Sequence, residues 1–478
     1  MVSTAPMAVS FGARVRRWLT TPAAALVALL LGCYAYFYQA GGWNQNSRFD
    51  LTRAVVEQGT LAIDAFQENT GDKAWRDGHW YTDKAPGLSL LAVPAYALVH
   101  AVRAGAVAAG AYLGTVFAVA LPSALAALQL YALGRVLGLS APWSAALTLA
   151  YALGTLALPY STIFYGHQLS AALGLSAFAL VWRCRAPMLA GLLLGLAVAV
   201  DYTSVILVIA VMGYAVAKLG ARGVLWLIAG GVPIALALGA YHAAAFGHPL
   251  ALPYEFVLQE HRRMGWFMGI AAPDPRVMGA LLVGRYRGLF FGSPWLVAGI
   301  PGLVVLARRR FRAEAITCGG IVLAYLLLNA GLVDWHGGWA MGPRYLIPAI
   351  PFLAVGAMGL VLAWPAGTPA RRLLASVGGA AAAVSFALML MGTAVRPDVP
   401  LTIARPFTQF VIPSFWHGRV ARSNHAIDGE GVSGARAAWN LGHLVGLDRL
   451  PTLLPLAAWM ALTGWWLARA VREDDASP

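Results

Sequence analysis

The sequence is poor in charged residues. Asp, Glu, Lys and Arg make up 11% of its 478 residues, whereas they approach about a quarter of a typical soluble protein. Hydrophobic residues make up 59% of the chain, and its mean hydropathy is +0.67. These values exclude an ordinary soluble domain and predict a polytopic membrane protein.

Other familiar features are also missing. The three cysteines, Cys33, Cys184 and Cys318, lie in or beside apolar segments and have no paired spacing, so neither a disulfide framework nor a zinc site is expected. There is no GxxxxGK[ST] motif and no strand-associated GxGxxG, so no nucleotide-binding loop is expected. No strong internal repeat divides the chain into matching halves, which disfavours a transporter built on repeats.

The net charge is +14, but it does not indicate a nucleic-acid partner. The arginines stand in short clusters between apolar runs, a pattern typical of cytoplasmic loops under the positive-inside rule. The clusters are at 14–17, 135, 183–185, 218–222, 308–312, 371–372 and 469–472. We therefore interpret the basic charge as a signal of membrane topology. We expect a multi-pass protein of the cell membrane whose N-terminus is cytoplasmic.

The apolar runs predict an all-α bundle of about twelve transmembrane helices, within a range of 11 to 13, in a single domain that spans residues 1–478. The candidate spans are 21–39, 107–136, 142–161, 166–183, 187–203, 204–218, 223–246, 289–307, 313–331, 345–364, 371–393 and 450–470.

Segment 86–103 decides the topology. It is apolar but contains Pro86 and Pro94. If it does not cross the membrane, the later basic clusters all fall on the cytoplasmic side, and if it crosses, nearly all fall outside. We therefore expect an interfacial or re-entrant segment inside a first extracytoplasmic loop, 40–106. Residues 247–288 and 394–449 are expected to form further extracytoplasmic loops.

The stretch 43–87 is the longest polar segment of the chain. Its apolar and charged residues from Ser47 onward fit an amphipathic helix that ends at Gly59. Asp50 and Asp64 are the candidate catalytic bases, because a partly desolvated carboxylate can take a proton from an acceptor hydroxyl. Asp64 follows an apolar run and is expected to be desolvated, while Arg53 is expected to neutralise Asp50. The alternative is a surface helix with solvated charges.

Lys84 is one of three lysines in the chain and stands just before Pro86 and an apolar run. A cation at this depth is suited to the phosphate of a lipid. The alternative is a lysine whose stem lies along the membrane interface and whose charge reaches water.

This region resembles the GT-C superfamily of glycosyltransferases that use polyprenyl-phosphate sugars, which includes protein O-mannosyltransferases and lipid A aminoarabinose transferases. Arg48-Phe49 is similar to the Arg-Tyr of those families, Gly59 to a following glycine, and Tyr81 with Lys84-Ala85-Pro86 to their Y..KPP motif. Gln45 and Asn46 stand where those families carry an acidic pair. The resemblance implies a GT-C-like bundle and a substrate-binding role for Arg48 and Tyr81.

Further candidates lie on the expected extracytoplasmic side. His167 begins an apolar span, and Asp201 with Tyr202 interrupts another, where an acidic residue is costly unless it faces a polar cavity. The remaining substrate-binding candidates are Glu255, His261, Asp334 and His336. Arg262, Arg263 and Arg344 are candidates for binding the donor phosphate, because arginine binds phosphate through two parallel hydrogen bonds.

We therefore predict a glycosyltransferase that moves a hexose or pentose from a polyprenyl-phosphate carrier to a glycan, lipid or protein acceptor on the extracytoplasmic side. A transporter or flippase of a lipid-linked sugar is the alternative, and a scaffold protein is a third hypothesis. No cofactor is predicted. The carboxylate-rich loop could hold a divalent metal ion, but the aspartate spacings match no metal motif, so no metal ligand is assigned.

Overall fold

The computed structural model describes residues 21–39, 41–258, 264–421 and 438–476. Its helices are α2 (Pro22–Ala35), α3 (Trp43–Arg53), α4 (Gly87–Val102), α5 (Val107–Thr115), α6 (Leu121–Val136), α7 (Ala141–Leu153), α8 (Ala157–Tyr160), α9 (Gly166–Trp182), α10 (Pro187–Val200), α11 (Val205–Phe246), α12 (Pro275–Val283), α13 (Leu289–Gly292), α14 (Gly299–Ala307), α15 (Arg312–Gly331), α16 (Ile350–Val361), α17 (Pro369–Val395), α18 (Ile412–Trp416), α19 (Leu441–Leu444) and α20 (Leu454–Ala476).

The described residues also form two short antiparallel strand pairs, which the all-α prediction did not include. β1 (Phe37–Gln39) pairs with β4 (Ala438–Asn440) and so joins the two ends of the chain. β2 (Lys73–Arg76) and β3 (His79–Thr82) form a hairpin. Its turn is Asp77-Gly78, with φ of 50° and 87°, which is the dipeptide and the backbone that a two-residue hairpin turn favours.

The bundle is helical, but the predicted count of twelve spans is not confirmed. Among the described residues, six helical segments are long and apolar enough to cross a membrane. They are Val107–Val136, Tyr202–Phe246, Arg312–Gly331, Arg344–Val361, Pro369–Val395 and Leu450–Asp475. Shorter apolar helices, such as Pro22–Ala35 and Pro187–Val200, account for part of the difference.

The long segment α11 contains a break that the sequence had predicted between two spans. Gly220 has φ 65° and ψ −179°, which no continuous helix contains. Glycine takes this backbone without steric cost. The expected spans 204–218 and 223–246 therefore correspond to the two halves of α11, on either side of Gly220.

The helices differ in how much of their surface is covered. α9 and α16 are buried on almost every face and form the centre of the bundle. In α17, by contrast, 11% of the most apolar 18-residue window is buried. A helix that is apolar on all sides and yet uncovered by protein is suited to contact lipid.

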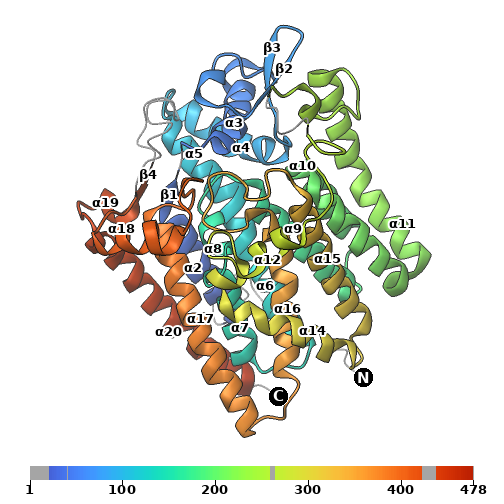
Figure 1. Cartoon of the computed structure of the whole chain (residues 1–478), viewed down its shortest axis with the longest axis vertical. Helices are drawn as coiled ribbons and strands as arrows, with labels where there is room; N and C mark the ends of the chain where they lie inside the picture. The colour runs from blue at the N-terminus through green and yellow to red at the C-terminus, as the bar shows by residue number, and fades with distance from the viewer. Residues whose placement is uncertain (1–20, 40, 259–263, 422–437, 477–478) are drawn as a thin grey trace, which may run out of the picture.

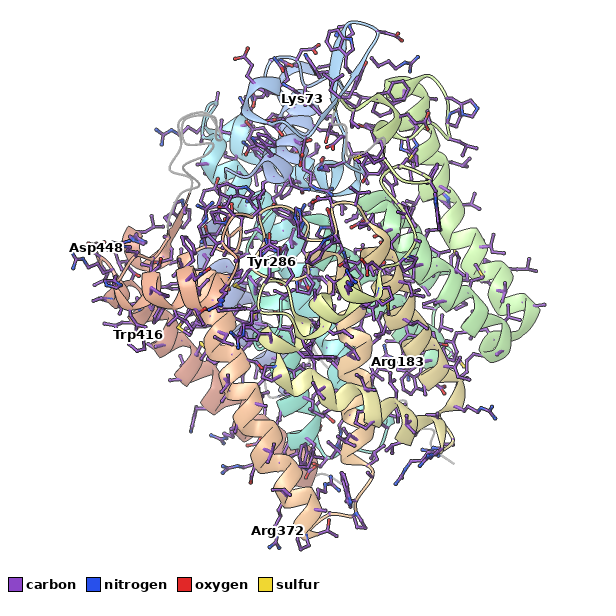
Figure 2. The ribbon with its side chains drawn as sticks, viewed as in Figure 1. Lys73, Arg183, Tyr286, Arg372, Trp416 and Asp448 are labelled. Carbon is purple, nitrogen blue, oxygen red and sulfur yellow. The ribbon has the colours of Figure 1, made fainter. Side chains whose placement is uncertain are left out.

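The molecule has a polar end and a basic end (Figures 1 and 2). The hairpin β2–β3 lies with α3 and α4 at the top of Figure 1, and Figure 2 places Lys73 there and Arg183 and Arg372 lower down. At the lower end Arg135 pairs with Asp475, at 3.5 Å, and Lys218 with Glu314, at 3.0 Å. The charge pattern had predicted this two-ended arrangement, and which end faces the cytoplasm stays a prediction.

The uncertain segment 86–103 forms α4, which packs against α3 at the polar end. The Tyr96 hydroxyl donates a hydrogen bond to Glu57, just beyond α3. The hydroxyl of Tyr112, on the next helix, donates to the Ala35 carbonyl at the end of α2, at 2.7 Å. The start of α5 thus lies at the same end as α4. The interfacial placement of α4 in a membrane remains a prediction.

Candidate functional site

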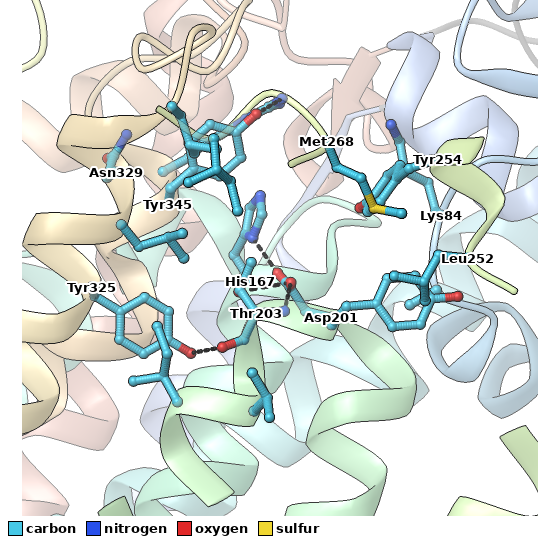
Figure 3. A pocket seen from close by; sticks show the side chains of 18 of the residues that line it. Lys84, His167, Asp201, Thr203, Leu252, Tyr254, Met268, Tyr325, Asn329 and Tyr345 are labelled. Atoms are coloured by element: carbon cyan, nitrogen blue, oxygen red, sulfur yellow. Dashed lines mark hydrogen bonds and ion pairs between the residues drawn. The ribbon is translucent and has the colours of Figure 1, made fainter. Parts of the chain in front are cut away.

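A cavity of about 340 Å³ lies at the polar end, where the first loop meets the ends of several bundle helices (Figure 3). Its polar lining residues are Asn44, Arg48, Lys84, His167, Asp201, Tyr202, Thr203, Tyr254, Tyr325, Asn329, Arg344 and Tyr345. Val205, Ile206, Leu328 and Leu332 provide part of an apolar wall. The lining thus holds three cations and one carboxylate beside a hydrocarbon surface.

The carboxylate is Asp201, which ends α10. Its backbone turns to an extended conformation, and its side chain caps the short 3-10 helix Tyr202–Ser204. One oxygen accepts hydrogen bonds from the backbone and the hydroxyl of Thr203, at 3.1 and 2.8 Å. The other lies 2.8 Å from Nδ1 of His167, the second residue of α9. Figure 3 shows this pair in the wall of the cavity. Both residues were predicted from the sequence, but not as a pair.

Arg48 connects the first loop to the bundle. Its guanidinium donates to Asn44 Oδ1, at 3.1 Å, and to the carbonyls of Ala85 and Val200, at 3.1 and 3.3 Å. Its exposed fraction is 4%. Burial lowers the pKa of Arg48 from its usual value, and the nearby Asp201 carboxylate opposes that shift. The solvated surface helix considered as the alternative is therefore wrong for this residue.

Lys84 lines the cavity, but it has carboxylate partners of its own. Its ammonium lies 2.9 Å from Asp83 and 2.9 Å from Asp72, and the Asp83 side chain is completely buried. The alternative, a lysine whose charge reaches water at the interface, does not fit this buried pairing. Two carboxylates around one ammonium leave Lys84 less available to a phosphate than the sequence suggested.

Arg344 opens the short 3-10 helix Arg344–Ala349. Its guanidinium carbon lies 5.3 Å from the ring centre of Tyr165 and 5.2 Å from that of Tyr345, which is cation–π distance. Its Nε is buried and has no hydrogen-bond partner among the described residues. A buried donor without a partner costs about 1–3 kcal/mol. This unused donor points to a ligand.

Asp50, the candidate base that was expected to lie in the cavity, is not among its lining residues. It is 1% exposed, and Asn69 donates to its Oδ1 at 3.0 Å. Arg53 was expected to neutralise it, but Arg53 bonds to Glu57 instead, at 2.8 Å. Burial therefore dominates and raises the pKa of Asp50 to about 8.

Asp64, the second candidate base, is exposed. Its side chain keeps 44% of its accessible surface in the protein, and its expected desolvation against the membrane stays a prediction. The carboxylate accepts a hydrogen bond from the backbone N–H of Trp80, at 2.6 Å, and lies 2.7 Å from His79. Asp64 thus fastens the preceding loop to the β2–β3 hairpin, away from the cavity.

The other candidates lie beside the cavity or outside the described residues. Tyr81 packs against Phe246, Glu255 accepts from the N–H of Leu252, and Asp334 pairs with His336 at 3.1 Å. None of Tyr81, Glu255, Asp334 and His336 is among the described lining residues. His261, Arg262 and Arg263 lie outside the residues that the structure describes.

Sequence reasoning missed several lining residues. Asn329 is buried in the apolar helix α15, and its amide donates to the Trp335 carbonyl at 2.8 Å. An asparagine inside an apolar span is costly, and that signal could have identified it. Tyr254 and Asn44 lie among other polar and aromatic residues, where no sequence signal distinguishes them.

In the described ranges, no group of three or more His, Cys, Asp or Glu side chains is placed to hold a metal ion. The cavity itself contains a single carboxylate and a single histidine from these residue types.

The fold is similar to that of ArnT from Cupriavidus metallidurans, in a crystal structure bound to undecaprenyl phosphate. The TM-score is 0.50, the sequences are 16% identical, and the match covers 97% of this chain and 78% of that one. The archaeal oligosaccharyltransferase AglB from Archaeoglobus fulgidus, in complex with an inhibitory peptide and a dolichol-phosphate, matches with a TM-score of 0.45, 15% identity, and coverage of 84% and 58%. The apo form of the oligosaccharyltransferase from the same organism gives 0.42, 16%, 83% and 57%.

No protein-family model and no curated protein sequence matches the chain. The chain spans little more than half of the length of the oligosaccharyltransferase. At these identities the similarity establishes the fold. The chain is a multi-pass membrane protein with the GT-C fold, as the sequence predicted.

Proposed function

We propose that this protein transfers a sugar from a polyprenyl-phosphate carrier to an acceptor at the polar end of the bundle. The observation that carries the proposal is the buried, unpartnered Nε of Arg344 in a cavity that also contains Arg48. Guanidinium groups bind phosphate oxygens in a fixed geometry. Arg344, supported by Arg48, is therefore the proposed site for the donor phosphate. Lys84 lines the same cavity but is already paired with Asp72 and Asp83.

The apolar wall supports a lipid-linked donor. Val205 and Ile206 open α11, and Leu328 and Leu332 lie at the end of α15. Val205 is 47% exposed and Ile209, one turn further along α11, is 68% exposed. An apolar surface thus leads from the cavity to the outside of the bundle, where a prenyl chain in the bilayer could follow it while its phosphate reaches the arginines.

The pair of His167 and Asp201 is the proposed base. Both Asp201 oxygens already accept hydrogen bonds, so its role is to orient His167 through Nδ1 and to stabilise the imidazolium that forms. Nε2 of His167 then takes the proton of the acceptor hydroxyl. Asp50 and Asp64, the bases that the sequence favoured, are not among the lining residues of this cavity.

In the proposed reaction the acceptor oxygen attacks the anomeric carbon of the sugar. The bond between that carbon and the phosphate oxygen breaks, and its electron pair stays on the phosphate, which leaves as polyprenyl phosphate. Arg344 and Arg48 stabilise the negative charge that develops on the leaving oxygen, which is the electrostatic contribution to catalysis. The proton of the acceptor ends on His167 and returns to solvent.

The identity of the sugar, hexose or pentose, and of the acceptor stays open. Asn44, Tyr254 and Asn329 offer hydrogen-bonding groups to sugar hydroxyls.

The test is a transfer assay with the full chain in lipid nanodiscs. Undecaprenyl-phosphate donors that carry different hexoses and pentoses are supplied with membrane glycan, lipid and peptide acceptors, and mass spectrometry measures the release of undecaprenyl phosphate. We expect release from at least one donor, and loss of that release in the Asp201→Asn variant. Arg222→Gln, an exposed arginine at the basic end, is the control.

A second preparation, in proteoliposomes, distinguishes a flippase. In proteoliposomes, a flippase moves the labelled donor between leaflets with its sugar–phosphate bond intact. Movement across the bilayer without cleavage of any donor would reject the transferase and favour the transporter.

A further inference from the structure

A second cavity, of about 320 Å³, lies at the opposite end of the molecule, between α7, α16 and α17. It begins at Trp143 and Leu374, near the starts of α7 and α17, and extends to Ala150 and Ala382. From Leu374 to Ala382 the helix rises by about 12 Å. The cavity is thus an elongated slot that runs along the bundle, separate from the candidate catalytic site.

The lining of this slot is hydrocarbon except for two indoles. The Trp295 indole N–H already donates to the Gly154 carbonyl, at 3.2 Å. A cavity this poor in polar groups is unfavourable for ordered water, which needs about two to four polar partners. Gly378 and Gly379 on α17 leave it open, because a Cβ added to either glycine meets no atom within 4 Å. The slot therefore has the shape and the chemistry to take an alkyl chain.

Arginines surround the mouth of the slot. Arg371 lies with its guanidinium carbon 5.6 Å from the ring centre of Trp143, a lining residue, and donates to the Trp364 carbonyl at 3.5 Å. Arg309 donates to the carbonyl of Leu362, next to the lining residue Val361. Arg372 is exposed beside them and lies at the lower tip of Figure 2.

Two carboxylates at this end, Asp474 and Asp475, share Arg135, at 3.9 and 3.5 Å, and Asp475 also accepts a hydrogen bond from the N–H of Ala141 at the start of α7. Arg309, Arg371 and Arg372 have no carboxylate partner among the described residues. Their charge at the mouth of the slot is therefore available to an anionic lipid headgroup, which basic groups between transmembrane helices favour.

We propose that this slot binds one anionic phospholipid of the leaflet at the basic end. One acyl chain occupies the space beside Gly378 and Gly379, and the phosphate lies against Arg371 and Arg309. Neither the apolar slot nor the arginines alone select this ligand, but together they match a molecule with an alkyl chain and an anionic head. The site is independent of the proposed sugar transfer.

The experiment is native mass spectrometry on the full chain, delipidated in a neutral detergent and titrated with dioleoyl phosphatidylglycerol or dioleoyl phosphatidylcholine. We expect about tenfold tighter binding of phosphatidylglycerol or more. Both lipids offer a phosphate, but phosphatidylcholine also carries a cation that offsets it, and each arginine near an anionic lipid contributes about 1 kcal/mol. Gly378→Leu should fill the slot and reduce phosphatidylglycerol binding at least about tenfold. Arg371→Gln should bring the affinity for the two lipids together.

Gly464→Leu is the matched control. Gly464 lies on α20, outside the slot, and a Cβ added there also meets no atom within 4 Å, so binding should not change. Thermal unfolding in detergent checks that each variant folds, and Gly379→Leu is a second filling variant. Equal affinity of the parent protein for the two lipids overturns the proposal. Unchanged phosphatidylglycerol binding in both Gly378→Leu and Gly379→Leu also overturns it.

Discussion

Asp50 and Asp201 are both buried carboxylates at the polar end of the molecule, with exposed fractions of 1% and 8%, yet their surroundings differ. Asp201 accepts hydrogen bonds at both oxygens and lines a cavity with three cations. Asp50 has one oxygen without a described partner, and it is buried on α3 without lining that cavity. Both carboxyl groups are removed from water, but only one that lines a cavity can contact a substrate.

The largest expected effect is on turnover, and it distinguishes Asp201 from Asp50. Asp201→Asn removes the group that orients His167, and His167→Gln removes the proposed base, so each should reduce turnover by about 10²–10⁴-fold. The measurement is the rate of undecaprenyl phosphate release at saturating donor. Asp50→Asn is the matched variant in the other region and should keep most of this rate. A collapse of turnover in Asp50→Asn with normal turnover in Asp201→Asn would reverse the comparison.

Lys84 tests how the two regions are joined, because it comes from the first loop and reaches the cavity. Lys84→Ala leaves the buried carboxylate of Asp83 without its ammonium, and removing one member of a buried ion pair costs about 3–5 kcal/mol of stability. We expect a clearly lower unfolding temperature in detergent. The double variant Lys84→Met with Asp83→Asn removes both charges and should recover most of the loss. Wild-type stability in Lys84→Ala would contradict the buried pairing.

Arg344 tests the ligand that the cavity is proposed to hold. Arg344→Gln should weaken binding of undecaprenyl phosphate by about 1.5–3 kcal/mol, the contribution of a charge-assisted hydrogen bond. Native mass spectrometry or calorimetry in nanodiscs measures this affinity. Arg222→Gln, at the other end of the molecule, should bind as the parent does. Unchanged affinity in Arg344→Gln would remove the proposed phosphate role.

The smallest effect concerns stability at Asp50. Because burial raises its pKa to about 8 from an ordinary value of 3.8, the folded protein binds a proton here that the unfolded chain releases between those pH values. This contribution to folding stability is therefore present at low pH and is lost as the pH rises toward about 8, with a slope of at most about 1.4 kcal/mol per pH unit.

Asp50→Asn keeps the acceptor oxygen for Asn69 and removes the titration. Its unfolding temperature should change less between about pH 4 and about pH 8 than that of the parent, and at the upper value it should be at least as stable. If the parent instead gains stability relative to Asp50→Asn as the pH rises across this range, Asp50 is not a buried, uncharged carboxyl.

Periodicity and charge in the sequence were enough to predict a helical membrane bundle with a polar end and a basic end. These features depend on local spacing and on composition, which neighbouring residues determine. The first-loop helix continues from α3 through the π-helical turn Ala54–Gln58 and ends at Gly59 with φ 67°, as predicted, since glycine accepts this backbone. The separation of two spans near Gly220 was predicted from the apolar runs on either side of Lys218 and Arg222. The number of spans was less certain, because several apolar helices are shorter than a full crossing.

The grouping of the site residues was only partly accessible. Six predicted residues, Arg48, Lys84, His167, Asp201, Tyr202 and Arg344, line one cavity. Each carried a local signal, a charge or a polar group beside an apolar run. The pairing of Lys84 with Asp72 and of His167 with Asp201 could not be predicted, because the paired residues are separated in the sequence and meet only in the folded chain.

The sequence by itself thus determined where polarity is costly and therefore which residues are special, because the cost of placing charge beside a hydrophobic run depends on neighbouring residues alone. The tertiary structure decided which of these residues meet. Asp50 and Asp64 had the stronger sequence arguments, yet packing buried Asp50 on α3 outside the cavity and left Asp64 on the protein surface. The ends of α9 and α10 instead brought His167 and Asp201 within 2.8 Å. Proximity across the fold follows from the packing of whole helices, which no local pattern specifies.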